Sequence, residues 1–312
     1  MSAEAGELCS SSEELTLLLL SDSSLPVGGF VSSSGLESFT NHGFLAHCKT
    51  DLARSHALVK FTFSNAQSYA SLCGAFFYHL HTLVTDTLKP NAEDQDRLDP
   101  SQASAAQEEE EQRLQQIARI VHKLNQLFDS MCLSPVNRRN SYAQGAAFLL
   151  LYSKSFGPPA GPSSGTGLER LKSRLIDSLK REIRRGNGSI HYPISFAFVT
   201  GLLGLSFDRA IHLHIFLHIR SILSAAVRLN IIGPYLSQKI MFTNMKSMLD
   251  SISGEIDGKR LARSDLVECG LLDPGQPESV ADRVEDGPAT TWPFGEIIQT
   301  RHDSCHVRLF NS

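Results

Sequence analysis

The sequence predicts an all-α protein that folds as a single helical-bundle domain. Strand signals are sparse, apolar residues recur at helical spacing, and 41% of the 312 residues are apolar, which is enough to bury a sizeable core. The clearest amphipathic stripe has leucine or isoleucine at steps of three or four residues, at Leu168, Leu171, Leu175, Leu179 and Ile183. We place the all-helical domain at residues 13–260, after a flexible N-terminus over 1–12.

The expected helices follow one another from the N-terminus. A leucine-rich helix begins near Glu13 and ends before Pro26, because proline fixes φ and discourages helix in the residue before it. Further helices are expected over 50–83, 108–128, 140–154 and 168–183, and a central buried helix over 206–230. Gly233 and Pro234 end that helix and start another, which runs to about Asp250, since proline suits the first helical turn.

Two acidic stretches stand apart from this pattern. Residues 90–112 carry eight acidic residues and one arginine, and residues 264–291 carry seven and one. Both lack aromatic residues, so we expect an acidic disordered insertion at 90–112 and an acidic disordered spacer at 264–291. The spacer leads to a C-terminal docking tail, 292–312. A flexible Gly/Pro/Ser linker is expected at 157–167.

Charge and hydropathy exclude several kinds of partner. The chain has a net charge of −4, so the residues outside the two acidic stretches sum to +9, which suits an acidic partner. Nucleic acid is not expected, because basic and aromatic residues do not alternate as in stacking platforms. The longest apolar run, 193–207, is shorter than the ~20 residues that a bilayer span needs. We therefore expect a cytoplasmic protein with no membrane partner.

The segment around Gly28 and Gly29 resembles a phosphate-binding loop at first sight. A Walker loop needs G-x-x-x-x-G-K followed by serine or threonine, and the chain contains no such string. The two glycines instead allow a sharp turn, after which Ser34 and Glu37 fit a capping box for a helix that begins at Gly35. Phe30 lies in this turn, either tucked under it or exposed.

Neither a catalytic residue nor a metal ligand is assigned. Ser163 has a formal G-x-S-x-G match, but proline and glycine surround it and no strand precedes it. His214 and His218 lie one turn apart in an apolar segment, where core histidines are the simpler interpretation. A second cluster, in the tail, comprises His302, Cys305 and His306, and it lacks a fixed frame.

Five segments in register carry a resemblance to a known family. They are L-P-x-G-G-F…S-x-G-L-E from Leu25 to Glu37, Arg138-x-x-Ser141-x-x-x-Gly145, His191-x-Pro193, Arg228-Leu229…Gly233…Gln238, and His302-Asp303…Arg308-Leu309-Phe310-Asn311-Ser312. Together they resemble the UreF urease accessory proteins, in a eukaryotic, fungal or plant-like form. Three positions depart from the family pattern, namely Asp303, His306 and Pro234.

The resemblance implies an all-helical, usually dimeric scaffold that is not an enzyme. UreF proteins bridge UreD, also called UreH, which contacts apo-urease, and UreG, the GTPase that brings nickel. They regulate the GTP-dependent insertion of nickel into urease. Nickel and GTP would then be handled by partner proteins, with no cofactor bound directly to this chain.

The resemblance also implies which residues matter. Partner-binding roles are expected for Pro26, Gly28, Gly29, Phe30, Ser34, Glu37, Arg138, Ser141, His302, Arg308, Leu309 and Phe310. Structural roles are expected for Arg228, Gly233 and Gln238, with Arg228 pairing with Glu37 because an unpaired buried arginine is costly. We hypothesise that the tail docks on UreD and supports the 28–34 loop that UreG meets.

Three alternatives stay open. Phe30 could serve core packing alone. The chain could activate UreG through an arginine finger at Arg138 or Arg139, which would need an exposed loop arginine. It could also be a stand-alone helical adaptor whose basic face over 172–185 recruits an acidic partner.

Overall fold

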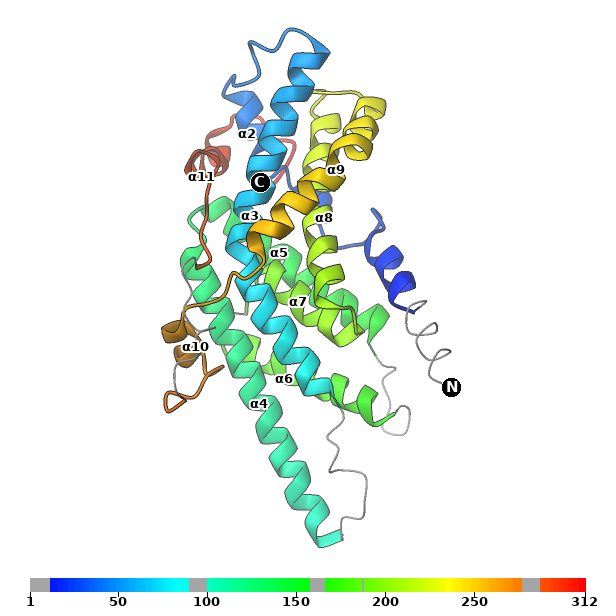
Figure 1. The fold of residues 1–312 in the computed structure, drawn as a ribbon, viewed down its shortest axis with the longest axis vertical. Helices are drawn as coiled ribbons and strands as arrows, with labels where there is room; N and C mark the ends of the chain where they lie inside the picture. Colours follow the sequence, from blue (N-terminus) through cyan, green and yellow to red (C-terminus); the bar gives the residue numbers. More distant parts are fainter. Residues whose placement is uncertain (1–11, 90–99, 158–165, 187, 277–286) are drawn as a thin grey trace.

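The computed structural model describes residues 12–89, 100–157, 166–186, 188–276 and 287–312, with the side chains of 100–106 left out, and these residues form helices and no strand (Figure 1). The all-α prediction is therefore confirmed. A first helix spans 12–20. The later elements are η1 (Gly29–Val31), α2 (Leu36–Asn41), α3 (Asp51–Leu88), α4 (Pro100–Met131), α5 (Pro135–Leu151), the π-helical η2 (Tyr152–Phe156), α6 (Gly167–Arg185), α7 (Tyr192–Leu203), α8 (Phe207–Arg228), α9 (Pro234–Ile256), α10 (Arg263–Cys269), α11 (Pro293–Thr300) and η4 (Arg301–Ser304).

The long helix α3 is the centre of the bundle, and α7, α8 and α9 pack along it (Figure 1). Thr50 starts α3, because its Oγ1 accepts a hydrogen bond from the Ala53 amide at 3.1 Å. Gly201 lets α7 approach closely, since a Cβ there would lie 2.9 Å from the Val84 side chain. The central helix expected over 206–230 is α8, which is long and apolar enough to cross a membrane, but 56% of its most apolar window is buried inside the protein.

The acidic insertion is partly helical, so the prediction of disorder for 90–112 is wrong over its second half. The helix α4 begins at Pro100, and residues 90–99 lie outside the described part of the chain. The glutamate run at 108–111 falls inside the helix expected over 108–128, and α4 extends that helix toward the N-terminus by eight residues. Another helix offsets the charge repulsion within the run.

That other helix is α6, which packs along α4. Arg174 forms ion pairs with Glu110 and, at 3.3 Å, with Glu111, and Arg181 reaches Glu111 at 2.7 Å. These pairs are half exposed, so each contributes little by itself. Two arginines of the basic face expected to recruit an acidic partner, Arg174 and Arg181, therefore meet acidic residues of their own chain.

The second acidic stretch is also more ordered than predicted. Disorder over 264–291 is wrong for residues up to 276, because α10 buries Leu266 and Cys269 and packs against α4. Residues 277–286 lie outside the described residues.

Smaller differences concern element ends. The first helix ends at Leu20, well before Pro26, because the Asp22 carboxylate accepts a hydrogen bond from the Ser24 amide at 2.9 Å and folds the chain into a turn. The helix α9 continues beyond Asp250 to Ile256. The flexible N-terminus and most of the 157–167 linker, with Ser163, lie outside the described residues.

Candidate functional site

The Gly-Gly stretch forms a sharp surface loop. Gly28 has a φ of 72°, in the left-handed region where glycine avoids a steric clash. The short helical turn η1 follows and carries Phe30, whose surface is 67% exposed. Phe30 is therefore a surface residue and not part of the core.

The predicted capping box between Ser34 and Glu37 does not form. Gly35 is the N-cap of α2 and makes no side-chain cap, and Ser34 has a φ of 50°. The hydroxyl of Ser33 instead accepts a hydrogen bond from the Glu37 amide at 3.3 Å. The carboxylate of Glu37 is therefore available for another partner.

That partner is the C-terminal tail. Glu37 is 3% exposed, and its oxygens lie 2.9 Å from His302 Nε2, 2.5 Å from the Leu309 amide nitrogen and 3.1 Å from the Phe310 amide nitrogen. Because a carboxylate only accepts hydrogen bonds, the Nε2 of His302 carries the proton. A buried acidic group with three donors is well satisfied, and it fixes the tail against α2.

The end of the tail also pairs with the loop backbone. The Asn311 amide donates to the Val31 carbonyl at 2.9 Å, and the Ser33 amide donates to the Ser312 carbonyl at 2.8 Å. The hydroxyls of Ser32 and Ser312 lie 2.7 Å apart. The C-terminus accordingly lies close to α2 in Figure 1.

Arg228 joins the loop and the tail from α8. Its Nη1 donates to the Phe30 carbonyl, and its guanidinium lies 4.4 Å from the centre of the buried Phe310 ring and 5.5 Å from that of Phe30. The expected pair with Glu37 is therefore wrong, because the tail occupies that carboxylate. We call residues 26–34, Glu37 and 302–312 the loop–tail surface.

The two candidate arginine fingers, Arg138 and Arg139, lie on α5. Arg139 contacts both carboxylate oxygens of Asp303 at 2.8 Å, and Arg308 reaches the same carboxylate at 3.2 Å. Arg138 donates to the Cys132 carbonyl at 2.7 Å, at the end of α4. Both helical arginines are engaged within the chain, and neither projects from a loop as an arginine finger requires.

Ser141 belongs to a different place, the seam between α5 and α7. Its Oγ lies 3.1 Å from His191 Nδ1, and His191 Nε2 lies 3.1 Å from Asp129 Oδ1. The sequence of contacts from serine to histidine to aspartate resembles a catalytic triad. The Ser141 hydroxyl, however, also accepts a hydrogen bond from the Tyr192 amide, and the His191 side chain is fully buried. Burial lowers the pKa of His191 to about 4, which leaves a poor general base at neutral pH. The seam is therefore structural.

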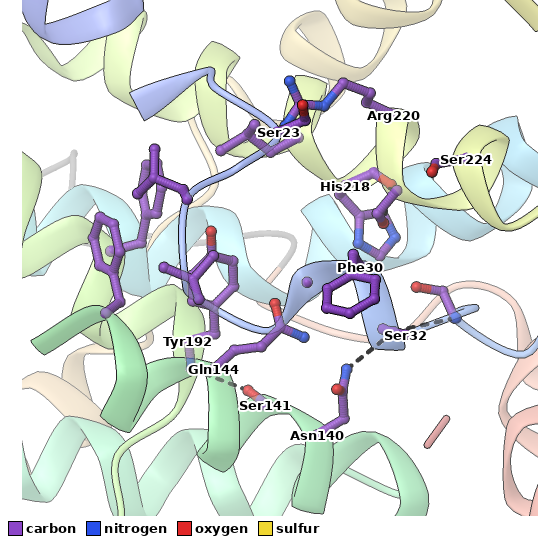
Figure 2. Close-up of a pocket in the computed structure, with 18 of the residues that line it drawn as sticks. Ser23, Phe30, Ser32, Asn140, Ser141, Gln144, Tyr192, His218, Arg220 and Ser224 are labelled. Carbon is purple, nitrogen blue, oxygen red and sulfur yellow. Dashed lines mark hydrogen bonds between the residues drawn. The ribbon is translucent and has the colours of Figure 1, made fainter. Parts of the chain in front are cut away.

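A cavity of about 140 Å³, lined by both polar and apolar side chains, lies beneath the loop (Figure 2). Across this cavity the Asn140 side-chain amide of α5 donates a hydrogen bond to the Ser32 hydroxyl of the loop at 3.1 Å. Gln144, Tyr192 and His218 also line the cavity. Neither Asn140 nor Gln144 was among the expected site residues. The sequence contained a signal, since polar side chains at 137, 140, 141 and 144 follow the spacing of one helix face.

The candidate metal ligands are engaged with protein groups. His214 Nε2 lies 2.8 Å from the Tyr69 hydroxyl, and His218 Nε2 lies 2.8 Å from Asn65 Oδ1. Burial lowers the pKa of His214 to about 3 and that of His218 to about 4, so both rings are neutral. Within the described residues no group of three histidine, cysteine or acidic side chains is placed to hold a metal ion.

The remaining expected residues fall into two groups. Pro26 and Leu309 are exposed on the loop–tail surface, Leu309 at 62%. Val307, which sequence reasoning missed, is 81% exposed beside it. Gly233 is the N-cap of α9 and Gln238 is exposed on that helix, away from the core.

The chain is similar in sequence to several known proteins. The UreF family model matches residues 52–244. Urease accessory protein 6 of Cryptococcus neoformans is 36% identical over 326 aligned positions, covering 97% of this chain and 98% of that protein. An uncharacterized UreF-like urease accessory protein of Schizosaccharomyces pombe is 23% identical over 95% of each chain. Urease accessory protein F of Arabidopsis thaliana is 30% identical over 36% of this chain and 42% of its own length.

Proposed function

The chain is a member of the UreF family of urease accessory proteins, and we propose that it is a non-enzymatic scaffold in urease maturation. In this role it bridges UreD (UreH) and the GTPase UreG on apo-urease. It regulates the GTP-dependent insertion of nickel, while nickel and GTP themselves are bound by its partners.

The loop–tail surface is the observation that supports this role. Phe30, Val307 and Leu309 are exposed apolar side chains, and they stand on backbone that Glu37 and Arg228 hold in place. Interfaces draw most of their affinity from a few residues that become fully buried at their centre, and aromatic residues and arginine are the most frequent among these. Because these anchors are already ordered, a partner pays little conformational entropy on binding.

We assign the two halves of this surface to different partners. The tail, with Val307 and Leu309, faces UreD, and the loop, with Phe30, faces UreG. We further propose that the chain works as a homodimer in the cytoplasm, as its family likeness implies.

The test uses purified chain with UreD and UreG from the same organism. Substituting both Val307→Ser and Leu309→Ser is expected to reduce UreD binding at least tenfold, and Phe30→Ala is expected to reduce UreG binding. These side chains are exposed, so helical circular dichroism and the melting temperature stay unchanged. Leu150→Ser is the matched control, because Leu150 is 58% exposed on α5.

The outcome in cells completes the test. In a strain that lacks its own copy of the gene, the wild-type chain restores urease activity and the tail double variant does not. Wild-type chain that binds neither protein, or full urease activity without the chain, would contradict the scaffold role.

A further inference from the structure

The helix α9 exposes two aromatic side chains to solvent. Tyr235 and Phe242 are each 91% exposed, and Lys239 and Lys246 lie between and after them. Steps of four, three and four residues place all four side chains within about 60° of one helix face. We call this set the aromatic–lysine stripe.

The stripe is held rigidly toward solvent. On the opposite side of α9, Ile240, Met245, Met248 and Ile252 are buried against the bundle. The helix lies along the outside of the bundle in Figure 1, with α3 and α8 beneath it. The rings therefore have no route into the core without unfolding α9.

The charge of the stripe favours an acidic partner. The described residues place no carboxylate within 4 Å of Lys239. Lys246 contacts Asp250 at 2.6 Å, but both side chains are largely exposed, so this pair is weak and easily exchanged. Lysine beside an aromatic ring suits a surface that offers carboxylates around an apolar hollow.

The same charge disfavours a second copy of this chain as the occupant. A two-fold contact brings the same patch of each copy together. An antiparallel pairing of two stripes centred near Phe242 would oppose Lys239 of one copy with Lys246 of the other. Like charges facing each other cost binding energy, and the Asp250 carboxylate beside Lys246 offsets only part of this cost because the pair is largely exposed.

We propose that the aromatic–lysine stripe is a second docking site, separate from the loop–tail surface, and that it binds an acidic surface of another protein in the urease maturation complex. This inference rests on the proposed scaffold function. Beyond that function, the inference identifies the face of the chain that binds a further partner, and it requires an acidic surface on that partner.

The experiment measures the affinity of purified UreD, UreG and apo-urease, each alone, for four forms of the full chain: wild type, two double variants of the stripe and one control. The variants are Tyr235→Ala with Phe242→Ala, and Lys239→Glu with Lys246→Glu. One of the three proteins is expected to lose at least tenfold in affinity with both variants, and its affinity for wild type should fall as salt rises. The charge-matched control is Lys154→Glu with Arg184→Glu, two exposed positions on η2 and α6.

Three results would overturn the stripe as an acidic docking site. They are unchanged affinity of both variants for all three proteins, loss of a homodimer in light scattering with the aromatic variant, and stripe-dependent binding to phosphatidylserine vesicles without any effect on the three proteins. A wild-type chain that binds none of them contradicts the scaffold function as well. Intact wild-type binding that the variants do not alter contradicts the stripe alone.

Discussion

Removing the Glu37 carboxylate should release the C-terminal tail from the loop. In Glu37→Ala, two buried donors, His302 Nε2 and the Phe310 amide, and the half-buried Leu309 amide lose their acceptor. A buried donor left unsatisfied costs about 1–3 kcal/mol, so the loss of these hydrogen bonds costs about 3 kcal/mol. The loss is local, because it cannot exceed the free energy with which the tail docks.

Hydrogen exchange followed by mass spectrometry measures this loss. About 3 kcal/mol corresponds to roughly 100-fold faster exchange of the tail and loop amides, including those of Ser33 and Asn311. Exchange in α3 and α7 should not change. Glu37→Gln is the graded control, since its carbonyl oxygen still accepts from backbone amides, and it should exchange about tenfold faster. Tail protection that is equal in wild type and Glu37→Ala would refute the assignment of Glu37 as the anchor.

Other predictions concern the folded core. Gly145→Ala should lower the free energy of unfolding by roughly 3 kcal/mol in urea denaturation, because the new Cβ would lie 2.1 Å from the backbone carbonyl oxygen of Ile190, just before α7. Unchanged stability would show that the α5–α7 seam is loose. Gly254→Ala, in an open helical position, should instead raise it by about 0.5–1 kcal/mol, and a loss would mean that α9 is not helical there. Burial holds the pKa of His214 at about 3 and that of His218 at about 4, below the value of 6.5 in the unfolded chain. The folded state is therefore fully stable above pH 6.5, and it loses stability as the pH falls toward about 4, because the unfolded chain then binds more protons. At pH 5 each should cost on the order of 2 kcal/mol, and equal stability at pH 7.5 and pH 5 would contradict their burial.

Much of the helical framework was predictable from the sequence. Leucine and isoleucine at helical spacing anticipated α6, and Thr50, Gly233 and Pro234 marked helix starts. Local signals suffice there, because each concerns residues within one or two turns of one another. Residues 100–107, the start of α4, were mispredicted as disordered, whereas the expected helix over 108–128 already included the glutamate run. Arg174 and Arg181, which offset the charge of that run, lie more than 60 residues away from it.

In the site, too, local features were predictable from the sequence and long-range contacts were not. The sequence placed Gly28 and Phe30 in a turn, and the resemblance pointed to the tail. Glu37 fitted a capping box by local spacing, yet its carboxylate pairs with His302, 265 residues later. A side chain with two equally reasonable partners cannot be assigned until tertiary contacts decide between them. For the same reason Arg228 was paired with Glu37 and not with the Phe30 carbonyl and the Phe310 ring.

The central claim is that a tail anchored inside this chain presents side chains to UreD. Titration calorimetry of UreD against three forms of the chain tests it most directly: wild type, Val307→Ser with Leu309→Ser, and Leu150→Ser. We predict tight binding to wild type and to Leu150→Ser, and at least tenfold weaker binding to the tail variant. Equal affinity for all three forms would contradict the claim.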